Sequence, residues 1–203
     1  MSRPTTKRKA SALEDQARTF TVADYERMSA ANVFDPEERL ELIAGKIITR
    51  DPRTNVHEAA VELARRALER AFGEDFWVRL RSPLRFPDQH SEPEPDLAVV
   101  RGAPRTFVDL VHPYDHPSHA LLVVEITDSP RSRALSLAKV GIYAAAGIDD
   151  YWIVDLDRGV VDVHRSRQRD RARGGSYGEV RRSRRKDVIS VHDASVAVAD
   201  LLP

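Results

Sequence analysis

The chain has 203 residues, which is enough for one domain with a substantial core and leaves little room for a second. Basic and acidic side chains number 32 each and 41% of the residues are hydrophobic, so wholesale disorder is excluded. The absence of cysteine excludes disulfide scaffolds, thiolate metal sites and cysteine nucleophiles, and it is compatible with a reducing cytoplasm. No apolar run approaches the ~20 residues that span a bilayer, and no apolar stretch follows the basic N-terminus. We therefore expect a cytoplasmic protein with no membrane segment.

The first elements in chain order are a polar tail and a helix. Residues 1–18 are polar and are predicted to be a disordered tail in front of a single domain, residues 19–203. The first helix should begin after Thr21, whose hydroxyl can cap it with Asp24 at the third helical position. It is expected to run to about residue 31.

A hairpin and a second helix follow. Two short apolar runs, at residues 40–43 and 46–49, flank a glycine turn, which is the pattern of a β-hairpin. The second helix has Asn55 as its expected N-cap and Gly73 as its stop. Its apolar stripe is expected to face the core and consists of Val61, Ala64, Leu68 and Phe72.

The rest of the chain is rich in strands. Strands are expected at residues 76–81, 95–101, 120–127, 151–156, 160–165, 177–182 and 188–191. A third helix is predicted over about residues 132–146, and an arginine- and glycine-rich loop should precede Tyr177. Consecutive apolar residues in 95–101 and 120–127 indicate strands buried on both faces. The mixed order predicts a single α/β or α+β domain, with helices on both faces of its sheet.

Charge is distributed unevenly along the chain. Residues 88–128 hold eight acidic side chains against two basic ones, and residues 158–186 hold eleven basic against three acidic. An acidic centre beside a basic flank is typical of a protein that holds a cation in one place and a polyanion in another. The alternative for any single run is solvated surface charge. The candidates for contacts with a nucleic-acid backbone are Arg181, Arg182, Arg184 and Arg185.

Two carboxylates are expected to meet at one edge of the sheet. Asp96 opens one central strand, and Glu125 lies near the end of the next. If these strands pair antiparallel with Ala98 opposite Val123, the two acids come opposite each other on one face. Each would raise the pKa of the other unless a cation were present, and Mg²⁺ or Mn²⁺ is the simplest candidate. Asp96 alone could be a turn residue, whereas Glu125 in a buried strand needs a partner or a metal.

Three further polar side chains lie among apolar neighbours. Lys139 shares a helical stripe with Leu135 and Tyr143, so it either pairs with an anion or covers the core while its ammonium reaches water. Glu41 lies between two leucines of the first hairpin. His57 aligns with the buried stripe of the second helix, where an imidazole serves either as a cap or core residue or as part of a site.

Four segments occur in a characteristic order. They are residues 39–47 (RLELIAGKI), 92–100 (EPEPDLAVV), 122–129 (LVVEITDS) and 139–155, which runs from Lys139 through YAAAGI to YWIVD. Together they resemble the Uma family of "putative restriction endonucleases", within the PD-(D/E)XK nuclease superfamily. The resemblance covers roughly residues 20–203 and includes the closing VAVADLL.

The resemblance implies a restriction-endonuclease-like fold, a mixed sheet flanked by helices, with Asp96 and Glu125 as metal ligands. The superfamily's lysine usually follows the second acid by two positions, where Thr127 stands. The family pattern instead offers a lysine from the next helix, which is Lys139. That pattern also tends to have aspartate four residues before this lysine, where Leu135 stands, so a hydrogen bond from that position to the lysine is absent.

The resulting hypothesis is hydrolysis of DNA phosphodiester bonds by an endonuclease that requires Mg²⁺ or Mn²⁺. Asp96 and Glu125, aided by Glu41, would hold the metal. Lys139 would position water or stabilise the transition state, and the arginine-rich segment would bind the DNA backbone. A homodimer is one option for the assembly, because related folds often dimerise.

Two alternatives stay open. Leu135 allows a nuclease-fold protein that binds DNA but is catalytically impaired. The spacing of His112, His116 and His119 also suggests a zinc site, but the prolines between them prevent these histidines from sharing a helix face.

Overall fold

A six-stranded mixed sheet forms the centre of the computed structural model, which describes residues 17–107, 120–170 and 174–203. In spatial order the strands are β3 (Phe76–Leu80), β4 (Leu97–Arg101), β5 (Ala120–Thr127), β6 (Asp150–Asp155), β7 (Val160–Asp170) and β8 (Gly174–Arg184). Only β5 and β6 are parallel, and helix α4 (Pro130–Ala146) connects them; every other neighbouring pair is antiparallel. The predicted mixed sheet is therefore confirmed.

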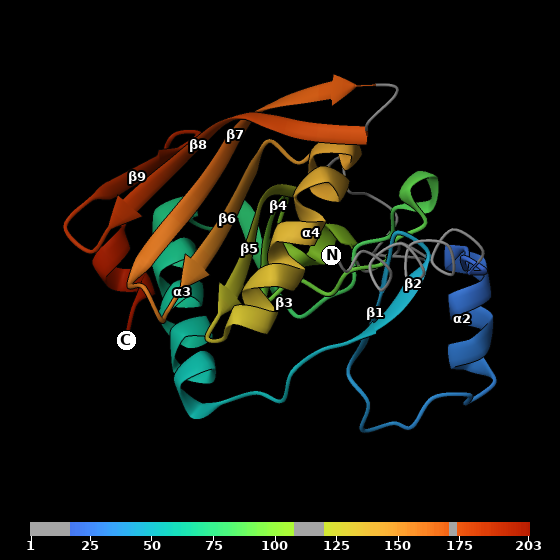
Figure 1. Cartoon of the computed structure of the whole chain (residues 1–203). Coiled ribbons are helices and arrows are strands. Elements are labelled where there is room, and N and C mark those ends of the chain that lie inside the picture. Colours follow the sequence, from blue (N-terminus) through green and yellow to red (C-terminus); the bar gives the residue numbers. More distant parts are fainter. Residues whose placement is uncertain (1–16, 108–119, 171–173) are drawn as a thin grey trace, which may run out of the picture.

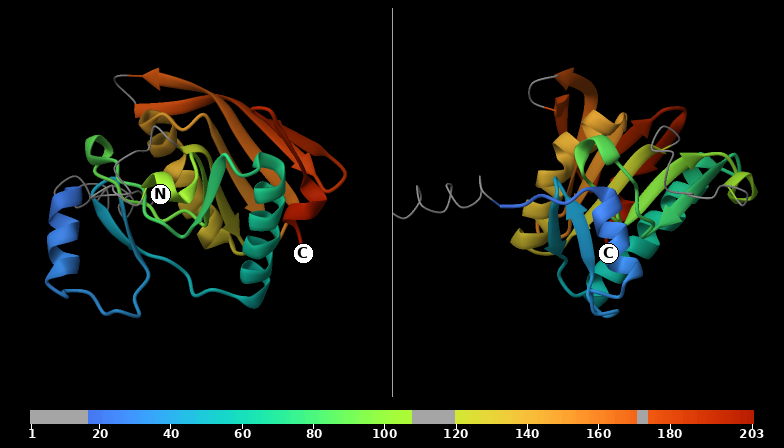
Figure 2. Two further views of the ribbon diagram at one scale, coloured as in Figure 1. Left: turned by 180° about the vertical axis from the view of Figure 1, so that it is seen from behind. Right: turned by 90° about the vertical axis from the view of Figure 1, so that its right-hand side faces the viewer.

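Helices cover the two faces of this sheet (Figures 1 and 2). Helix α3 (Asn55–Phe72) covers one face, and its predicted apolar stripe is buried there. Helix α4 covers the other face. Strand β5 supplies side chains to both layers, because Leu122 and Val124 join the core under α3 whereas Val123 joins the core under α4. This alternation explains the continuous apolar run of β5.

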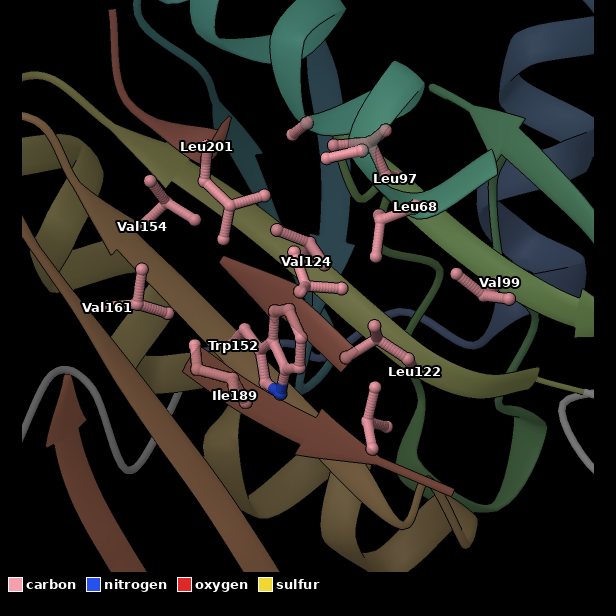
Figure 3. Packing of buried hydrophobic residues seen from close by; sticks show 14 of the residues in the cluster. Leu68, Leu97, Val99, Leu122, Val124, Trp152, Val154, Val161, Ile189 and Leu201 are labelled. Atoms are coloured by element: carbon pink, nitrogen blue, oxygen red, sulfur yellow. The ribbon is translucent and has the colours of Figure 1, made fainter. Parts of the chain in front are cut away.

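The core under α3 is the larger of the two (Figure 3). Trp152 of β6 is fully buried there beside Val124 and Val161. Strands β9 (Val188–Val191) and β10 (Ala194–Ala197) form a separate hairpin, which closes this layer together with a short turn, η4 (Val198–Leu201). Two other short turns are η1 (Pro87–Gln89) and η2 (Pro104–Phe107).

The N-terminal elements lie beside the sheet (Figure 1). Helix α2 (Val22–Ala30) has the predicted cap, in which Thr21 and Asp24 bond each other's backbone reciprocally. Strands β1 (Leu40–Ile43) and β2 (Lys46–Thr49) form the predicted hairpin. Its two turn residues, Ala44 and Gly45, both have positive φ, as a tight two-residue hairpin turn requires.

Two helix starts differ from prediction. The N-cap of α3 is Thr54 and not Asn55: Thr54 Oγ1 accepts the backbone N–H of His57 at 3.1 Å. Helix α4 begins at Pro130 after the cap Ser129, two residues earlier than predicted, because proline at the first helical position needs no N–H partner.

The predicted arginine- and glycine-rich loop before Tyr177 is wrong, because β7 and β8 pair almost to their tips, from Val160 opposite Arg184 to Asp170 opposite Gly174. The arginines on both strands replace the alternation of apolar and polar residues by which a strand is recognised in a sequence. Gly175 permits this extension, since a Cβ there would lie 2.1 Å from the backbone N of Ala145 in α4.

Three predictions concern residues that the structure describes only in part or not at all. No helix in the described ranges is long and apolar enough to cross a membrane. Most of the expected N-terminal tail lies outside those ranges. His112, His116 and His119 also lie outside them.

Candidate active site

The two predicted acids meet at one edge of the sheet. Strands β4 and β5 pair with Ala98 opposite Val123, the predicted register, and this pairing continues toward Asp96 and Glu125. Both acidic side chains are buried. The Oδ2 of Asp96 accepts the backbone N–H of Ile126 at 2.8 Å, which fixes the start of β4 to the end of β5.

Lys139 is fully buried and pairs with carboxylates, so the alternative in which its ammonium reaches water is wrong. Its Nζ lies 2.8 Å from Glu125 Oε1 and 2.7 Å from Glu41 Oε2. One turn further along α4, the hydroxyl of Tyr143 donates to Glu125 Oε1 at 3.0 Å. The predicted stripe of α4 therefore binds Glu125 through two groups.

Glu41 gives Lys139 a second carboxylate partner, whereas Leu135, four residues before the lysine, gives it none. Leu135 lies half-buried at the rim of the site and offers Lys139 no hydrogen bond. The second carboxylate of the lysine comes from Glu41 on β1, which also accepts the backbone N–H of Glu94 through Oε1 at 3.0 Å. Lys139 is therefore paired with a carboxylate that is distant from it in sequence.

His57 faces the site from the first turn of α3. Its Nε2 lies 3.2 Å from Asp96 Oδ1, and its side chain is buried. The cap of the same helix, Thr54, donates its hydroxyl to Asp128 Oδ2 at 2.6 Å, just beyond the end of β5. Helix α3 is therefore held against the end of β5, and the imidazole orients Asp96.

Arg50 is the site residue that the sequence analysis missed. It follows β2 directly, and its Nη2 lies 3.1 Å from Asp96 Oδ1 and 3.8 Å from Glu125 Oε2. Its Nη1 donates to the carbonyl of Glu94 at 2.6 Å and lies 3.4 Å from Glu41 Oε1. Strand alternation could have indicated this position, because Arg50 is two residues after Ile48, which packs against the core.

The two central acids have opposite pKa shifts. Burial raises the pKa of Asp96, but the hydrogen bond to His57 and the charge of Arg50 outweigh it, so the pKa lies below its ordinary 3.8. For Glu125 burial prevails over the opposing charges of Lys139 and Arg50, and its pKa lies above 4.5. Burial alone would lower the pKa of Lys139, but its two carboxylate partners raise it above 10.5. Lys139 therefore stays an ammonium.

A cavity of about 240 Å³ opens onto this cluster. Glu125, Ile126 and Lys139 lie in its wall. The other charged side chains that line it are Arg39, Arg50, Asp51, Arg53, Asp128 and Arg131. Four arginines against two aspartates give the cavity a mainly cationic lining, which suits an anionic group such as a phosphate.

The donor chemistry fits a hard divalent cation. Among the residues that the structure describes, no three His, Asp or Glu side chains surround one point as ligands of a bound metal would. Instead, the buried carboxylates of Glu41, Asp96 and Glu125 surround the two cations Arg50 and Lys139. The three acids outnumber the two permanent cations, with His57 also against Asp96, and carboxylate oxygens suit Mg²⁺ or Mn²⁺.

The four predicted DNA-contacting arginines do not form one surface. Arg182 donates to both oxygens of Asp162 at 2.7 and 3.0 Å, on the α4 side of the sheet. Arg181 is its neighbour on β8 and therefore points to the opposite face. Arg184 shares the α4 side by the same alternation, and Arg185 donates to the carbonyl of Pro203 at 2.7 Å.

A mixed sheet with helices on both faces, two acids at the ends of its central strands and a lysine beside them is the arrangement expected of a restriction-endonuclease-like protein. Residues 22–197 match the Uma2 family, described as "Putative restriction endonuclease", and the chain belongs to that family. The fold is similar to the crystal structure of a "putative nuclease belonging to DUF820" from Anabaena variabilis. The TM-score is 0.67 at 16% identity, over 90% of this chain and 97% of that one. No curated protein matches the chain.

Proposed function

We propose that this protein is a metal-dependent endonuclease that hydrolyses DNA phosphodiester bonds. The observation that carries the proposal is the buried contact of Lys139 with Glu125, next to Asp96, on the wall of a cationic cavity. Membership of the Uma2 family supports it. The printed title of the structural neighbour, a nuclease, agrees with it.

Asp96 and Glu125 would hold the metal, Mg²⁺ or Mn²⁺, with the carbonyl of Ile126 beside them. The bound metal would lower the pKa of a water molecule and neutralise charge on the phosphate. Asp96 suits this task because its lowered pKa keeps it ionised. His57 orients the Asp96 carboxylate through the contact at Oδ1, and the Ile126 N–H orients it at Oδ2.

Lys139 would act through its positive charge and not as a base. Its raised pKa keeps the ammonium protonated, so Nζ donates hydrogen bonds and cannot take a proton from water. Glu41 holds Nζ from one side and Glu125 from the other. A fixed ammonium at the cavity wall stabilises negative charge that develops on the phosphate during hydrolysis.

The cationic lining of the cavity would bind the backbone of the substrate. Arg53 and Arg131 have side chains that are 35% and 70% exposed, so both can reach a phosphate outside the cavity. Contacts of this kind give affinity without base specificity. Arg184, on the α4 side of β8, would add a further backbone contact, and Arg181 would add one on the opposite face of the sheet.

Cleavage of defined substrates tests the proposal. Supercoiled plasmid, single-stranded DNA and RNA are incubated with the protein in Mg²⁺, Mn²⁺ or EDTA. We expect DNA cleavage with either metal, no cleavage in EDTA, and loss of cleavage in Asp96→Asn and Glu125→Gln. Glu62→Gln is the matched control, because Glu62 is an exposed acid on α3 that pairs only with arginines of its own helix. Cleavage that survives EDTA, or that both site variants retain, contradicts the proposal.

The second candidate is a DNA-binding protein of this fold without turnover. The position of Arg50 between Asp96 and Glu125 favours it, because the guanidinium stands where both acids would have to bind a metal. DNA binding measured by fluorescence anisotropy, combined with no cleavage at any metal concentration, would support this candidate over the enzyme.

A further inference from the structure

Arg50 lies at the centre of the buried carboxylates and is held there from two sides. Its side chain is only 9% exposed. The Nη1 donates to the backbone carbonyl of Glu94 at 2.6 Å, and the Nη2 pairs with Asp96 Oδ1 at 3.1 Å. Its own backbone N–H donates to the carbonyl of Arg39 at 2.8 Å. These bonds fix the guanidinium in one orientation.

One oxygen of each acid accepts hydrogen bonds from groups other than Arg50. Asp96 Oδ2 accepts the N–H of Ile126, and Glu125 Oε1 accepts from Lys139 and Tyr143. The other oxygen of each acid lies next to Arg50: these are Asp96 Oδ1, which also lies 3.2 Å from His57 Nε2, and Glu125 Oε2. Both lie within 3.8 Å of Arg50 Nη2. A metal shared by the two acids therefore needs the place that the guanidinium holds.

We propose that Arg50 is the resident counter-cation of this site, and that a divalent metal binds to Asp96 and Glu125 only by displacing its guanidinium. This inference rests on the proposed function, because it assumes that these acids are the metal ligands. The cavity beside Arg50 gives the displaced side chain somewhere to go, since Asp51 and Asp128 in its wall can accept the guanidinium.

Displacement has a measurable consequence for metal affinity. When only a fraction of the molecules has Arg50 out of the site, the apparent dissociation constant of the metal increases in inverse proportion to that fraction. Removal of the guanidinium removes this competition, so the metal should bind more tightly. The arginine also neutralises the acids when no metal is present, so its removal should destabilise the metal-free protein.

The test is Mn²⁺ binding by isothermal titration calorimetry in the absence of DNA. We expect Arg50→Met to bind Mn²⁺ at least about tenfold more tightly than the parent. Arg53→Met is the matched control: Arg53 lines the same cavity but pairs with Glu58 and Glu94, not with Asp96 or Glu125. It removes one positive charge from the cavity without opening the metal position, so its affinity should increase by less than about threefold.

Melting temperature gives a second readout. Without metal, Arg50→Met should melt below the parent, and saturating Mn²⁺ should raise its melting temperature by more than that of the parent. If Arg50→Met does not fold, Arg50→Lys takes its place. It keeps the charge but loses the forked donor group, and its Mn²⁺ affinity should still exceed that of the parent.

These measurements distinguish failure of this inference from failure of the proposed function. If the parent binds Mn²⁺ and the Arg50 variants bind it equally or less tightly, the inference is overturned and the proposed function stands. An increase in Arg53→Met as large as in Arg50→Met also overturns it, because general charge would then explain the effect. If neither the parent nor any variant binds Mn²⁺, the inference and the metal dependence of the proposed function both fail.

Discussion

Two clusters of ionic side chains lie at the same edge of the central sheet and differ in charge balance. The site cluster consists of Glu41, Arg50, Asp96, Glu125 and Lys139. The edge cluster consists of Arg133, Asp155, Asp162 and Arg182. In the edge cluster, Arg133 bonds Asp155 at 2.7 Å and Asp162 at 2.8 Å, and Arg182 bonds Asp162 at 2.7 Å. Arg158 also lies 3.4 Å from Asp155, so the two anions there meet three arginines, whereas the site cluster has three anions for two permanent cations.

Under the proposed function, this difference separates a structural arrangement from a functional one. The edge cluster ties the first turn of α4 to β6, β7 and β8, and every carboxylate in it has an arginine partner. The site cluster lines a cavity and keeps an excess of buried negative charge, which is costly unless a further cation is bound. Unbalanced charge beside a cavity is therefore the feature that marks the site.

The largest effect should come from Lys139→Met. Removal of the ammonium should lower the single-turnover cleavage rate by about two to three orders of magnitude. It should also lower the free energy of unfolding by roughly 3–5 kcal/mol, because two buried carboxylates lose their partner. Rates are measured below the melting temperature of the variant. Unchanged cleavage by folded Lys139→Met would remove this residue from the catalytic account.

The corresponding change in the edge cluster is Arg133→Met. This variant should lose about 1–3 kcal/mol of unfolding free energy, less than Lys139→Met, because Asp155 keeps Arg158 and Asp162 keeps Arg182 as a partner. Its cleavage rate per folded molecule should stay that of the parent. Chemical denaturation and single-turnover kinetics check both points, and a large loss of rate would contradict the division into two clusters.

Acid should act in opposite directions on Glu125 of the site cluster and Asp162 of the edge cluster. The pKa of Glu125 is raised in the folded protein, so the folded state takes up its proton first, and this group adds stability as the pH falls toward 4.5. The pKa of Asp162 is lowered from 3.8: burial opposes this shift, but the bonds to Arg182 and Arg133 outweigh it. Asp162 therefore contributes stability above pH 3.8 that is lost as the pH falls through its folded pKa.

Denaturation of Glu125→Gln and Asp162→Asn against pH measures these two contributions. Relative to the parent, the free energy of unfolding of Glu125→Gln should increase most at neutral pH and least near pH 4.5. Asp162→Asn should be least stable relative to the parent above pH 3.8 and should approach it in stronger acid. The same pH dependence in both variants would contradict the contrast between the clusters.

The smallest effects concern the arginines of β8. Arg181→Gln and Arg184→Gln should each weaken binding to all DNA sequences alike and reduce the slope of log K against log salt by up to about 0.9. Arg182→Gln should instead lower stability, because Arg182 bonds Asp162. Anisotropy titrations at several salt concentrations test this. Unchanged affinity and slope in the first two variants would show that Arg181 and Arg184 are only solvated surface charges.

The main elements and the meeting of Asp96 with Glu125 could be predicted because they depend on local pattern. Alternation, capping residues and glycines mark the helices and strands, and one assumed register brings the two acids together. Both strands of the β7–β8 hairpin were predicted too short, because the arginines in their outer parts replace the apolar alternation on which strand prediction relies. Arg50 was missed because an arginine after a strand is usually exposed, although alternation from Ile48 places it on the inward side of the hairpin.

The partners of Lys139 also show that local sequence pattern does not reveal contacts made by the tertiary fold. The apolar stripe on α4 indicated that the lysine lies in the interior, but it did not say which anion meets it. Glu125 could be expected from its place in the preceding strand. Glu41 reaches the lysine from a hairpin almost a hundred residues away in sequence, a contact that the tertiary fold alone creates.

Mn²⁺ binding by the parent, Asp96→Asn and Asp162→Asn tests the central claim most directly. Both substitutions remove one buried carboxylate at the same edge of the sheet, one from each cluster. The account predicts saturable binding by the parent and by folded Asp162→Asn, and no binding by folded Asp96→Asn. Equal binding by all three, or loss of binding in Asp162→Asn alone, would contradict it.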